Sequence, residues 1–189
     1  MEPVSAKFTD REIAAVAGRI DRPIVLVGLM GVGKSTVGRK LAELLNFTFV
    51  DADAEIEAAS QQTIPEIFDQ FGEDYFRDGE RRVIARLMEE GHGVIATGGG
   101  AFVNDETRDL VLERGIGVWI DCDVETLVER TARRSNRPLL QDGDPEEILR
   151  KLSDARAPSY AKAPIKVQSK PGPHVETALA ILGAIERWL

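Results

Sequence analysis

The chain has 189 residues, of which 43% are hydrophobic, and a formal net charge of −8. This length favours one well-buried α/β domain, and no Ser/Pro/Gly-rich linker divides the chain. The acidic balance argues against a protein that coats nucleic acid or an anionic membrane, so an anionic ligand requires a local cluster of Arg and Lys. No apolar run reaches the roughly 18 to 20 residues of a membrane span, and residues 1–10 lack the pattern of a secretory signal. We therefore expect a cytoplasmic protein without nucleic acid or membrane partners.

The N-terminal segment, residues 1–22, is predicted to be a helical extension. Ile13 and Val16 have helical spacing, and Thr9 with Glu12 is typical of a capping box. We expect this helix to pack on the core, and contact with a partner subunit is the alternative. It offers no catalytic residue.

The organising motif is Gly28-Leu29-Met30-Gly31-Val32-Gly33-Lys34-Ser35, a G-x-x-x-x-G-K-[ST] phosphate loop. Residues 24–27 before it have the apolar pattern of a buried parallel strand, and residues 36–45 after it have helical periodicity. In this context backbone N–H groups and the helix N-terminus bind phosphate. Lys34 then reaches the β- and γ-phosphates, and Ser35 offers its hydroxyl to Mg²⁺. A chance glycine turn before a helix is the alternative.

A second predicted strand, residues 47–50, ends at Asp51 and Asp53. Ligands of open α/β sheets bind beyond the carboxyl ends of the strands, and alternation along an extended segment places both carboxylates on one side. One is suited to hydrated Mg²⁺, and the other to accept the proton of an attacking hydroxyl. The alternative is that one of them caps the following helix, residues 54–59, and Asp53 could do so while also serving as the base.

Two helices are predicted next. Thr63 and Glu66 form a capping box around Pro65, which predicts a short helix that ends near Gly72. A second helix follows over residues 73–90.

On that second helix Phe76, Arg77 and Glu80 fall within one turn. Composition alone predicts only a solvated Arg–Glu pair. A third strand, residues 92–97, then runs into Gly98-Gly99-Gly100, where the backbone can approach a ligand closely and leave N–H groups free to bind oxygen. A flexible turn is the alternative, although a turn needs one glycine with positive φ and not three.

The remaining elements are predicted as helix 105–114, strand 118–121, helix 124–134, a helix from 145 to about 155, strand 165–168 and helix 175–189. The single cysteine, Cys122, is expected to be a buried residue at a strand end. Residues 132–145 lack apolar periodicity and predict a mobile lid. Within it Pro138 keeps Arg137 extended, and an arginine on a closing lid stabilises a transferring phosphoryl group. A solvated basic loop is the alternative.

Together these motifs resemble those of the shikimate kinase family, within the nucleoside-monophosphate-kinase-like phosphate-loop enzymes. The matching marks are Gly28 to Thr36, Asp51-x-Asp53, Phe76-Arg77-x-x-Glu80, Gly98-Gly99-Gly100, Arg137-Pro138-Leu139-Leu140 and Arg156-x-Pro158-x-Tyr160, in order over residues 23–167. The resemblance implies a three-layer α/β/α fold with a five-stranded parallel sheet and a mobile lid. It implies ATP-dependent phosphorylation of the 3-hydroxyl of shikimate in chorismate biosynthesis, by a monomer with one Mg²⁺ per subunit.

The resemblance also implies roles for individual residues. Arg77, Arg156 and the Gly100 N–H hold the shikimate carboxylate, while Asp53 and the Gly99 region hold its ring hydroxyls. Asp53, Lys34 and Arg137 are the catalytic residues, with Asp53 as the base. Phe68 and Phe76 form an apolar wall, and Glu80 orients Arg77. Ser35 binds Mg²⁺ directly, Asp51 binds it through water, and Arg130 lies against adenine. The residues around the nucleotide are Gly31, Val32, Gly33, Lys34, Ser35, Thr36, Arg130 and Arg137.

The implied organisation is a single kinase domain over residues 1–189, with a phosphate-loop core at 23–52, a substrate-binding subdomain at 53–91 and a lid at 132–145. Three positions depart from the family pattern. Thr97 stands where Ser is expected, and Gly79 lowers helix propensity by ~1 kcal/mol relative to Ala. The turn at residues 168–172 lacks the expected Asp-Thr pattern, which leaves the adenine contacts open. The alternative functions are that of a kinase for another small polyol acid such as gluconate, and that of a regulatory ATP-binding module without catalysis.

Overall fold

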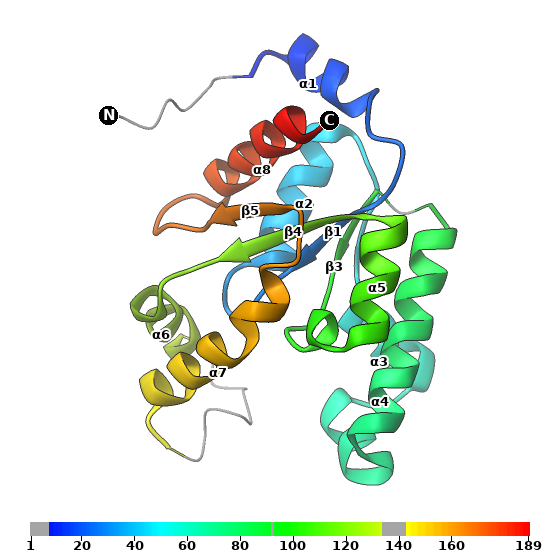
Figure 1. The fold of residues 1–189 in the computed structure, drawn as a ribbon, viewed down its shortest axis with the longest axis vertical. Coiled ribbons are helices and arrows are strands. Elements are labelled where there is room, and N and C mark those ends of the chain that lie inside the picture. The colour runs from blue at the N-terminus through cyan, green and yellow to red at the C-terminus, as the bar shows by residue number, and fades with distance from the viewer. Residues whose placement is uncertain (1–7, 92, 134–142) are drawn as a thin grey trace.

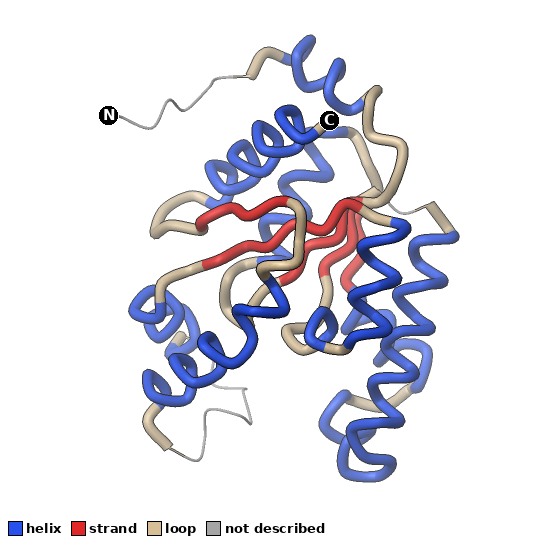
Figure 2. The backbone as a smooth tube through the Cα atoms, viewed as in Figure 1, coloured by secondary structure: helices blue, strands red, loops and turns tan. Residues whose placement is uncertain are grey.

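A five-stranded parallel sheet forms the centre of the computed structural model, which describes residues 8–91, 93–133 and 143–189 (Figure 1). The strands are β1 (Ile24–Val27), β2 (Phe49–Asp51), β3 (Val94–Ala96), β4 (Ile116–Asp121) and β5 (Ile165–Gln168), in the order β2-β3-β1-β4-β5. Every neighbouring pair is parallel. Helices cover both faces of the sheet (Figure 2), which confirms the predicted three-layer fold.

The helices are α1 (Asp10–Ala17), α2 (Lys34–Leu45), α3 (Ala52–Ser60), α4 (Ile64–Glu89), α5 (Asp105–Arg114), α6 (Val124–Ala132), α7 (Pro145–Tyr160) and α8 (His174–Trp188), with a short 3₁₀ helix at Ala101–Val103. One face of the sheet is covered by α2 and α8, which pack on each other, and α4 and α5 lie on the other face. The N-terminal helix α1 contacts α2 and α8 through buried Ile13 and Val16, so the predicted packing of this helix on the core is confirmed.

The central strand β1 explains where the site lies. All four of its residues are fully buried, as expected for a strand with neighbours on both sides and helices on both faces. It pairs with β3 on one side and β4 on the other, so the strand order reverses there. Ligands of open α/β sheets bind at such a switch point, beyond the carboxyl ends of the strands. The segments after β1, β2 and β3 therefore meet at one edge of the sheet.

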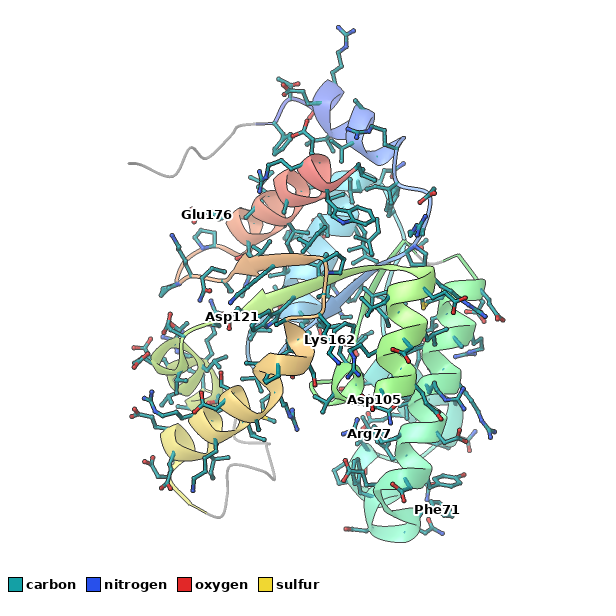
Figure 3. The ribbon with its side chains drawn as sticks, in the orientation of Figure 1. Phe71, Arg77, Asp105, Asp121, Lys162 and Glu176 are labelled. Carbon is teal, nitrogen blue, oxygen red and sulfur yellow. The ribbon has the colours of Figure 1, made fainter. Side chains whose placement is uncertain are left out.

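Helix α4 bends at Gly72, where the sequence predicts the end of one helix and the start of another. Gly72 has φ 82° and ψ 175°, in a region that favours glycine. The predicted capping box of Thr63 and Glu66 is present at the start of the helix. This bend forms the tip of α4 that lies far from the sheet, where the ring of Phe71 stacks on Tyr75 (Figure 3).

Two element boundaries differ from the predictions in ways that affect the site. Strand β2 begins at Phe49 instead of residue 47 and extends to Asp51. Helix α7 continues to Tyr160 instead of ending near residue 155, because Pro158 falls in its last turn, where one missing N–H is tolerated and the Ala161 N–H still bonds to the Ala157 carbonyl. Arg156 is therefore a helical residue.

The other boundaries agree closely with the predictions. Strand β4 starts two residues early, at Ile116, and helix α6 ends at Ala132. Residues 134–142, which include most of the predicted lid and Arg137, lie outside the described residues. In the described ranges no helix combines the length and hydropathy that a membrane span requires.

Cys122, directly after β4, is buried as predicted, with a side chain 5% exposed. Burial raises the pKa of its thiol to about 11. At pH 8 the thiolate is then on the order of one molecule in a thousand, and the thiolate is the reactive form. We expect iodoacetamide to leave the native protein unmodified over hours and to alkylate Cys122 rapidly in guanidinium, as measured by intact mass. Alkylation of the native protein at the rate of a free peptide thiol would contradict this placement.

Candidate active site

A pocket of about 710 Å³ opens at the carboxyl edge of the sheet, against the phosphate loop. Most of the sequence-predicted nucleotide and catalytic residues line it. Those residues are Gly31, Gly33, Lys34, Ser35, Thr36, Asp51, Asp53, Gly99 and Arg130. Of the others, Val32 does not line the pocket, because its side chain is 1% exposed and packs in the core, and Arg137 lies outside the described residues.

The phosphate loop holds its lysine over the pocket. Gly33, with φ 97°, ends the loop as the residue that caps α2, so the loop turns into the helix without a side chain in the way. The Lys34 ammonium donates to the backbone carbonyls of Gly28 at 2.7 Å and Leu29 at 2.8 Å. Because Lys34 also lines the pocket, its charge is fixed at the N-terminal end of α2, where an anion is favoured.

Asp51 connects the phosphate loop to helix α3. Its Oδ2 atom accepts a 2.5 Å hydrogen bond from the Ser35 hydroxyl, and its Oδ1 atom accepts from the backbone N–H groups of Asp53 and Ala54. Asp51, not Asp53, is therefore the residue that caps α3. The prediction that both carboxylates share one side of an extended segment was wrong in its geometry, because the chain turns into a helix at Ala52. Both carboxylates nevertheless line the same pocket.

Asp53, in the first turn of α3, has an environment suited to a base. Burial raises the pKa of its carboxyl above the ordinary value, and the negative charges of Asp51 and Glu57 act in the same direction. The positive charges of Lys34 and Arg77 oppose the increase. Asp53 is therefore a stronger proton acceptor than an exposed carboxylate, and two nearby cations help to keep it ionised.

The effect of Glu57 on Asp53 can be tested directly. Glu57→Gln removes one of the charges that raise the pKa of Asp53 and keeps the oxygen that accepts from the Ile64 N–H at 3.0 Å. We expect the acid limb of the pH profile of kcat/KM to move to lower pH, since this profile reports the free enzyme. Glu55→Gln is the matched control, because Glu55 pairs with Arg86 instead. An identical shift in both variants would exclude a specific effect of Glu57.

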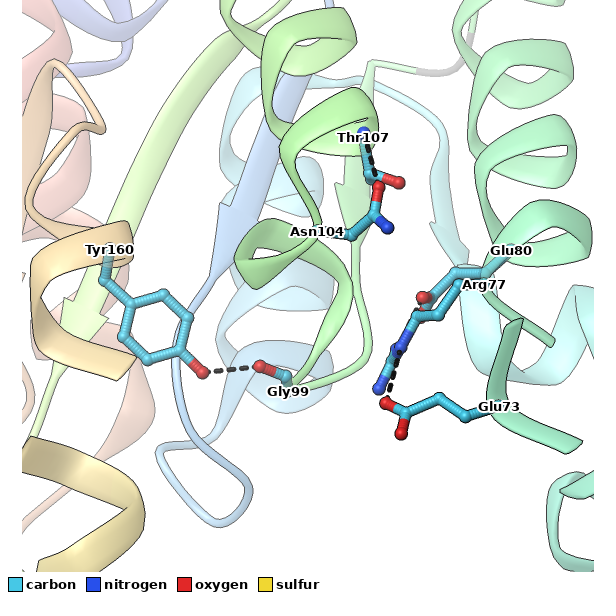
Figure 4. Close-up of polar contacts among 7 residues, drawn as sticks. All are labelled: Glu73, Arg77, Glu80, Gly99, Asn104, Thr107 and Tyr160. Atoms are coloured by element: carbon cyan, nitrogen blue, oxygen red, sulfur yellow. Dashed lines mark hydrogen bonds and ion pairs between the residues drawn. The ribbon is translucent and has the colours of Figure 1, made fainter. Parts of the chain in front are cut away.

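Arg77 is held by two carboxylates on its own helix (Figure 4). Its Nη1 atom donates to Glu80 at 2.6 Å, and its Nε atom lies 3.4 Å from Glu73. Glu80 is only 1% exposed, so the pair is not the solvated pair that composition alone predicts. Burial raises the pKa of Glu80 and the charge of Arg77 opposes the increase. The buried carboxylate therefore fixes the direction of the guanidinium.

The glycines after β3 make room for these side chains. None of Gly98, Gly99 and Gly100 has a positive φ, so their conformation does not require glycine. A Cβ on Gly98 would lie 2.7 Å from Oδ1 of Asp53, and a Cβ on Gly100 would overlap the Arg77 guanidinium. Close approach, and not a positive φ, is therefore what requires glycine at Gly98 and Gly100. The approaching groups here are the side chains of the site.

A second pocket, of about 400 Å³, lies between α4, α7 and the glycine loop. It brings together Arg77, Arg156 and Gly100, the three groups expected to hold a carboxylate. Phe68 and Phe76 line neither of these two pockets. Their rings lie 4.6 Å apart, and Phe76 is buried in a small cluster with Ile56 and Ile67. Their contact with a substrate ring stays a prediction.

Arg130, on α6, joins the phosphate loop to the turn after β5. Its guanidinium donates to the carbonyl of Val32 at 3.2 Å, to the hydroxyl of Ser169 at 3.1 Å and to the carbonyl of Lys170 at 2.9 Å. Ser169 is fully buried, and Pro171 and Gly172 of the same turn line the first pocket. The predicted contact of Arg130 with adenine stays a prediction.

Several residues that line the first pocket were not predicted from the sequence to do so. Thr126, Glu129 and Arg133 share the face of α6 that carries Arg130, which their spacing of three and four residues could have indicated. His174, the first residue of α8, lies against Gly33. No local motif marks it. Thr97 is buried and donates its hydroxyl to the Leu26 carbonyl at 2.9 Å, and it also lines the pocket.

Comparison with known proteins agrees with this geometry. The family model described as shikimate kinase matches residues 30–186. A shikimate kinase of Novosphingobium aromaticivorans is 59% identical over 193 aligned residues, which cover 100% of both chains. A shikimate kinase of Caulobacter vibrioides is 54% identical over 166 residues, 88% of this chain and 83% of that protein.

Among solved structures, the shikimate kinase from Acinetobacter baumannii in complex with shikimate superposes with a TM-score of 0.82 and 41% identity. The alignment covers 91% of this chain and 97% of that one. The residues that the family model matches include Lys34, Asp51, Arg77 and the glycine loop. The chain belongs to the shikimate kinase family.

Proposed function

We propose that this enzyme transfers the γ-phosphoryl group of ATP to the 3-hydroxyl of shikimate. The observation that carries the proposal is the arrangement of two adjoining pockets. One contains the phosphate loop with Lys34, and the other contains the arginine pair Arg77 and Arg156. Gly99 and Gly100 join them, and Asp53 lies on the nucleotide side of this junction.

The arginine pair accounts for the choice of a small carboxylate. A planar guanidinium recognises a carboxylate through two parallel hydrogen bonds, which a lysine cannot form. Glu80 fixes Arg77, so little side-chain freedom is lost when the substrate binds. The substrate hydroxyls then point toward Asp53. We propose that Asp53 accepts the proton of the attacking hydroxyl and that Lys34 neutralises charge on the transferred group.

The residues at the phosphate loop fit a magnesium ion bound with the nucleotide. Ser35 and Asp51 supply two oxygen atoms 2.5 Å apart, the hard donors that Mg²⁺ prefers. The described residues contain no group of three His, Cys, Asp or Glu side chains that could hold a metal, so we assign the remaining ligands to phosphate and water. When bound, Mg²⁺ neutralises the charge of the β- and γ-phosphates. Asp51 would contact it through water.

An assay of ADP release tests the proposal. We expect shikimate to stimulate ADP release by several orders of magnitude over ATP and Mg²⁺ alone, and gluconate or nucleoside monophosphates to give little stimulation. No stimulation by shikimate would overturn the assignment, and stimulation by gluconate alone would favour the rival kinase. A module without catalysis would release no ADP with any acceptor. The predicted lid role of Arg137, the monomeric state and the cytoplasmic location stay predictions.

A further inference from the structure

Tyr160 ends helix α7 and reaches the glycine loop from the side opposite to Arg77 (Figure 4). Its side chain is 2% exposed, and its ring packs on Trp119 with the centroids 5.8 Å apart. The hydroxyl donates a 2.5 Å hydrogen bond to the carbonyl of Gly99. The role proposed above for Arg77, Arg156 and Asp53 does not use this contact, although Tyr160 belongs to the Arg156-x-Pro158-x-Tyr160 motif.

The hydrogen bond fixes the peptide that joins Gly99 to Gly100. The carbonyls on either side are already bonded within the loop, Gly98 to the Ala101 N–H at 3.2 Å and Gly100 to the Val103 N–H at 3.1 Å. The Gly99 carbonyl turns outward to Tyr160 instead. The peptide is trans, so its N–H, that of Gly100, points away from the tyrosine.

That N–H group is free to bind a ligand. Within the described part of the chain the Gly100 N–H has no backbone acceptor. Gly100 lines the pocket that also contains Arg77 and Arg156. Tyr160 therefore sets the direction of one of the three donors expected at the carboxylate.

Arg156, a second donor expected at the carboxylate, lies near the same peptide. Arg156 precedes Tyr160 by four residues and lies on the same face of α7. Burial raises the pKa of Tyr160, and the nearby positive charge of Arg156 opposes the increase. A Cβ placed on Gly99 would lie 3.3 Å from the Nη1 atom of Arg156, so the guanidinium is adjacent to the glycine loop. The peptide that Tyr160 fixes therefore lies beside the Arg156 guanidinium.

We propose that Tyr160 is a positioning residue for the substrate carboxylate: its hydroxyl fixes the Gly99 peptide and so aligns the Gly100 N–H beside the Arg156 guanidinium. The proposal rests on the function proposed above, because it requires that the acceptor carboxylate binds there. It predicts that loss of the hydroxyl weakens binding of the carboxylate selectively. The phosphate loop and its nucleotide make no contact with Tyr160 in this scheme.

Tyr160→Phe tests the proposal with two acceptors, shikimate and its neutral carboxamide. Loss of this alignment should raise KM for shikimate about tenfold, the factor that corresponds to 1.4 kcal/mol. We expect KM for the carboxamide to change less than twofold, together with an unchanged KM for ATP. Tyr75→Phe is the matched control, since the only other tyrosine of the chain stacks on Phe71 at the tip of α4. It should leave all three values unchanged.

The outcomes separate the two proposals. A wild-type enzyme that does not respond to shikimate would overturn the proposed function. A responsive wild type whose Tyr160→Phe variant has equal increases in KM for both acceptors, or none, would overturn the positioning role alone. KM does not depend on the concentration of active enzyme, so the ratio of the two KM values holds for a partly folded variant. A variant that yields no folded protein would assign the hydroxyl to stability and would also overturn the positioning role.

Discussion

Asp53→Asn lowers kcat for shikimate phosphorylation by a factor of about 10² to 10⁴, the usual contribution of a positioned general base. The amide keeps the size of the side chain and cannot accept the proton of the attacking hydroxyl. We expect KM for ATP to change little, because Lys34 and the phosphate loop are untouched. Steady-state kinetics at pH 7 measure the effect, and Asp69→Asn, at an exposed position of α4, is the control.

The stability of the same variant separates chemistry from folding. Burial raises the pKa of Asp53 in the folded protein above its value in the unfolded chain. Ionised Asp53 therefore lowers the free energy of unfolding, and this loss develops as the pH rises from the unfolded pKa through the folded pKa. At pH 7 the asparagine variant should have a Tm equal to or above that of the wild type. A lower Tm together with lower kcat would assign the defect to folding.

Arg77→Ala raises KM for shikimate by a factor of about 10² or more, because hydrogen bonds between charged groups contribute about 1.5–3 kcal/mol each. A second effect has the same sign. Without Arg77 the buried carboxylate of Glu80 loses its partner and repels an incoming carboxylate. ATP affinity should stay nearly intact, since Arg77 lines the second pocket and not the first. Calorimetric titrations with ADP and with shikimate measure the two affinities separately.

Two further variants control for charge and for stability. Arg82→Ala removes an exposed arginine of the same helix, which pairs with Asp78, and should leave both affinities unchanged. Arg77→Ala combined with Glu80→Gln removes the unpaired buried charge and should recover stability without recovering shikimate binding. Equal losses of ADP and shikimate affinity in Arg77→Ala would refute the assignment of Arg77 to the substrate.

The fold was predictable because its elements carry strong local signals. The phosphate loop identifies the strand before it and the helix after it, and β5 and α5 have the bounds that periodicity predicts. Strand β2 was misplaced because Phe47 and Thr48 have the composition of a strand. The Thr48 carbonyl accepts a hydrogen bond from the Val94 N–H of the neighbouring strand β3, one residue before β2 begins. Helix α7 was predicted too short because Pro158 is a helix breaker in the interior but not in the last turn.

The site was predictable by residue type and much less by geometry. The Asp51-x-Asp53 pattern identified two carboxylates, but the turn into α3 at Ala52 depends on the cap that Asp51 itself provides. The burial of Glu80 depends on helices that pack around it, which no local pattern records. The links from Arg130 to Val32 and Ser169 span 98 and 39 residues, and only the folded chain brings them together.

The glycines of the phosphate loop and those of the glycine loop after β3 restrict the chain in different ways. Gly28 has φ 140°, and a Cβ there would overlap the backbone carbonyl of Ile120, so a larger residue opposes folding itself. Gly98 and Gly100 have ordinary conformations, and a larger residue there would displace side chains of the site, Asp53 and Glu80 at Gly98 and Arg77 at Gly100. Substitution of Gly28 in the phosphate loop thus lowers the amount of folded protein in the cell. Substitution of Gly98 or Gly100 in the glycine loop leaves a normal amount of protein that has low catalytic activity. Abundance and activity, measured together across the chain, would distinguish the glycines of the scaffold from those of the site.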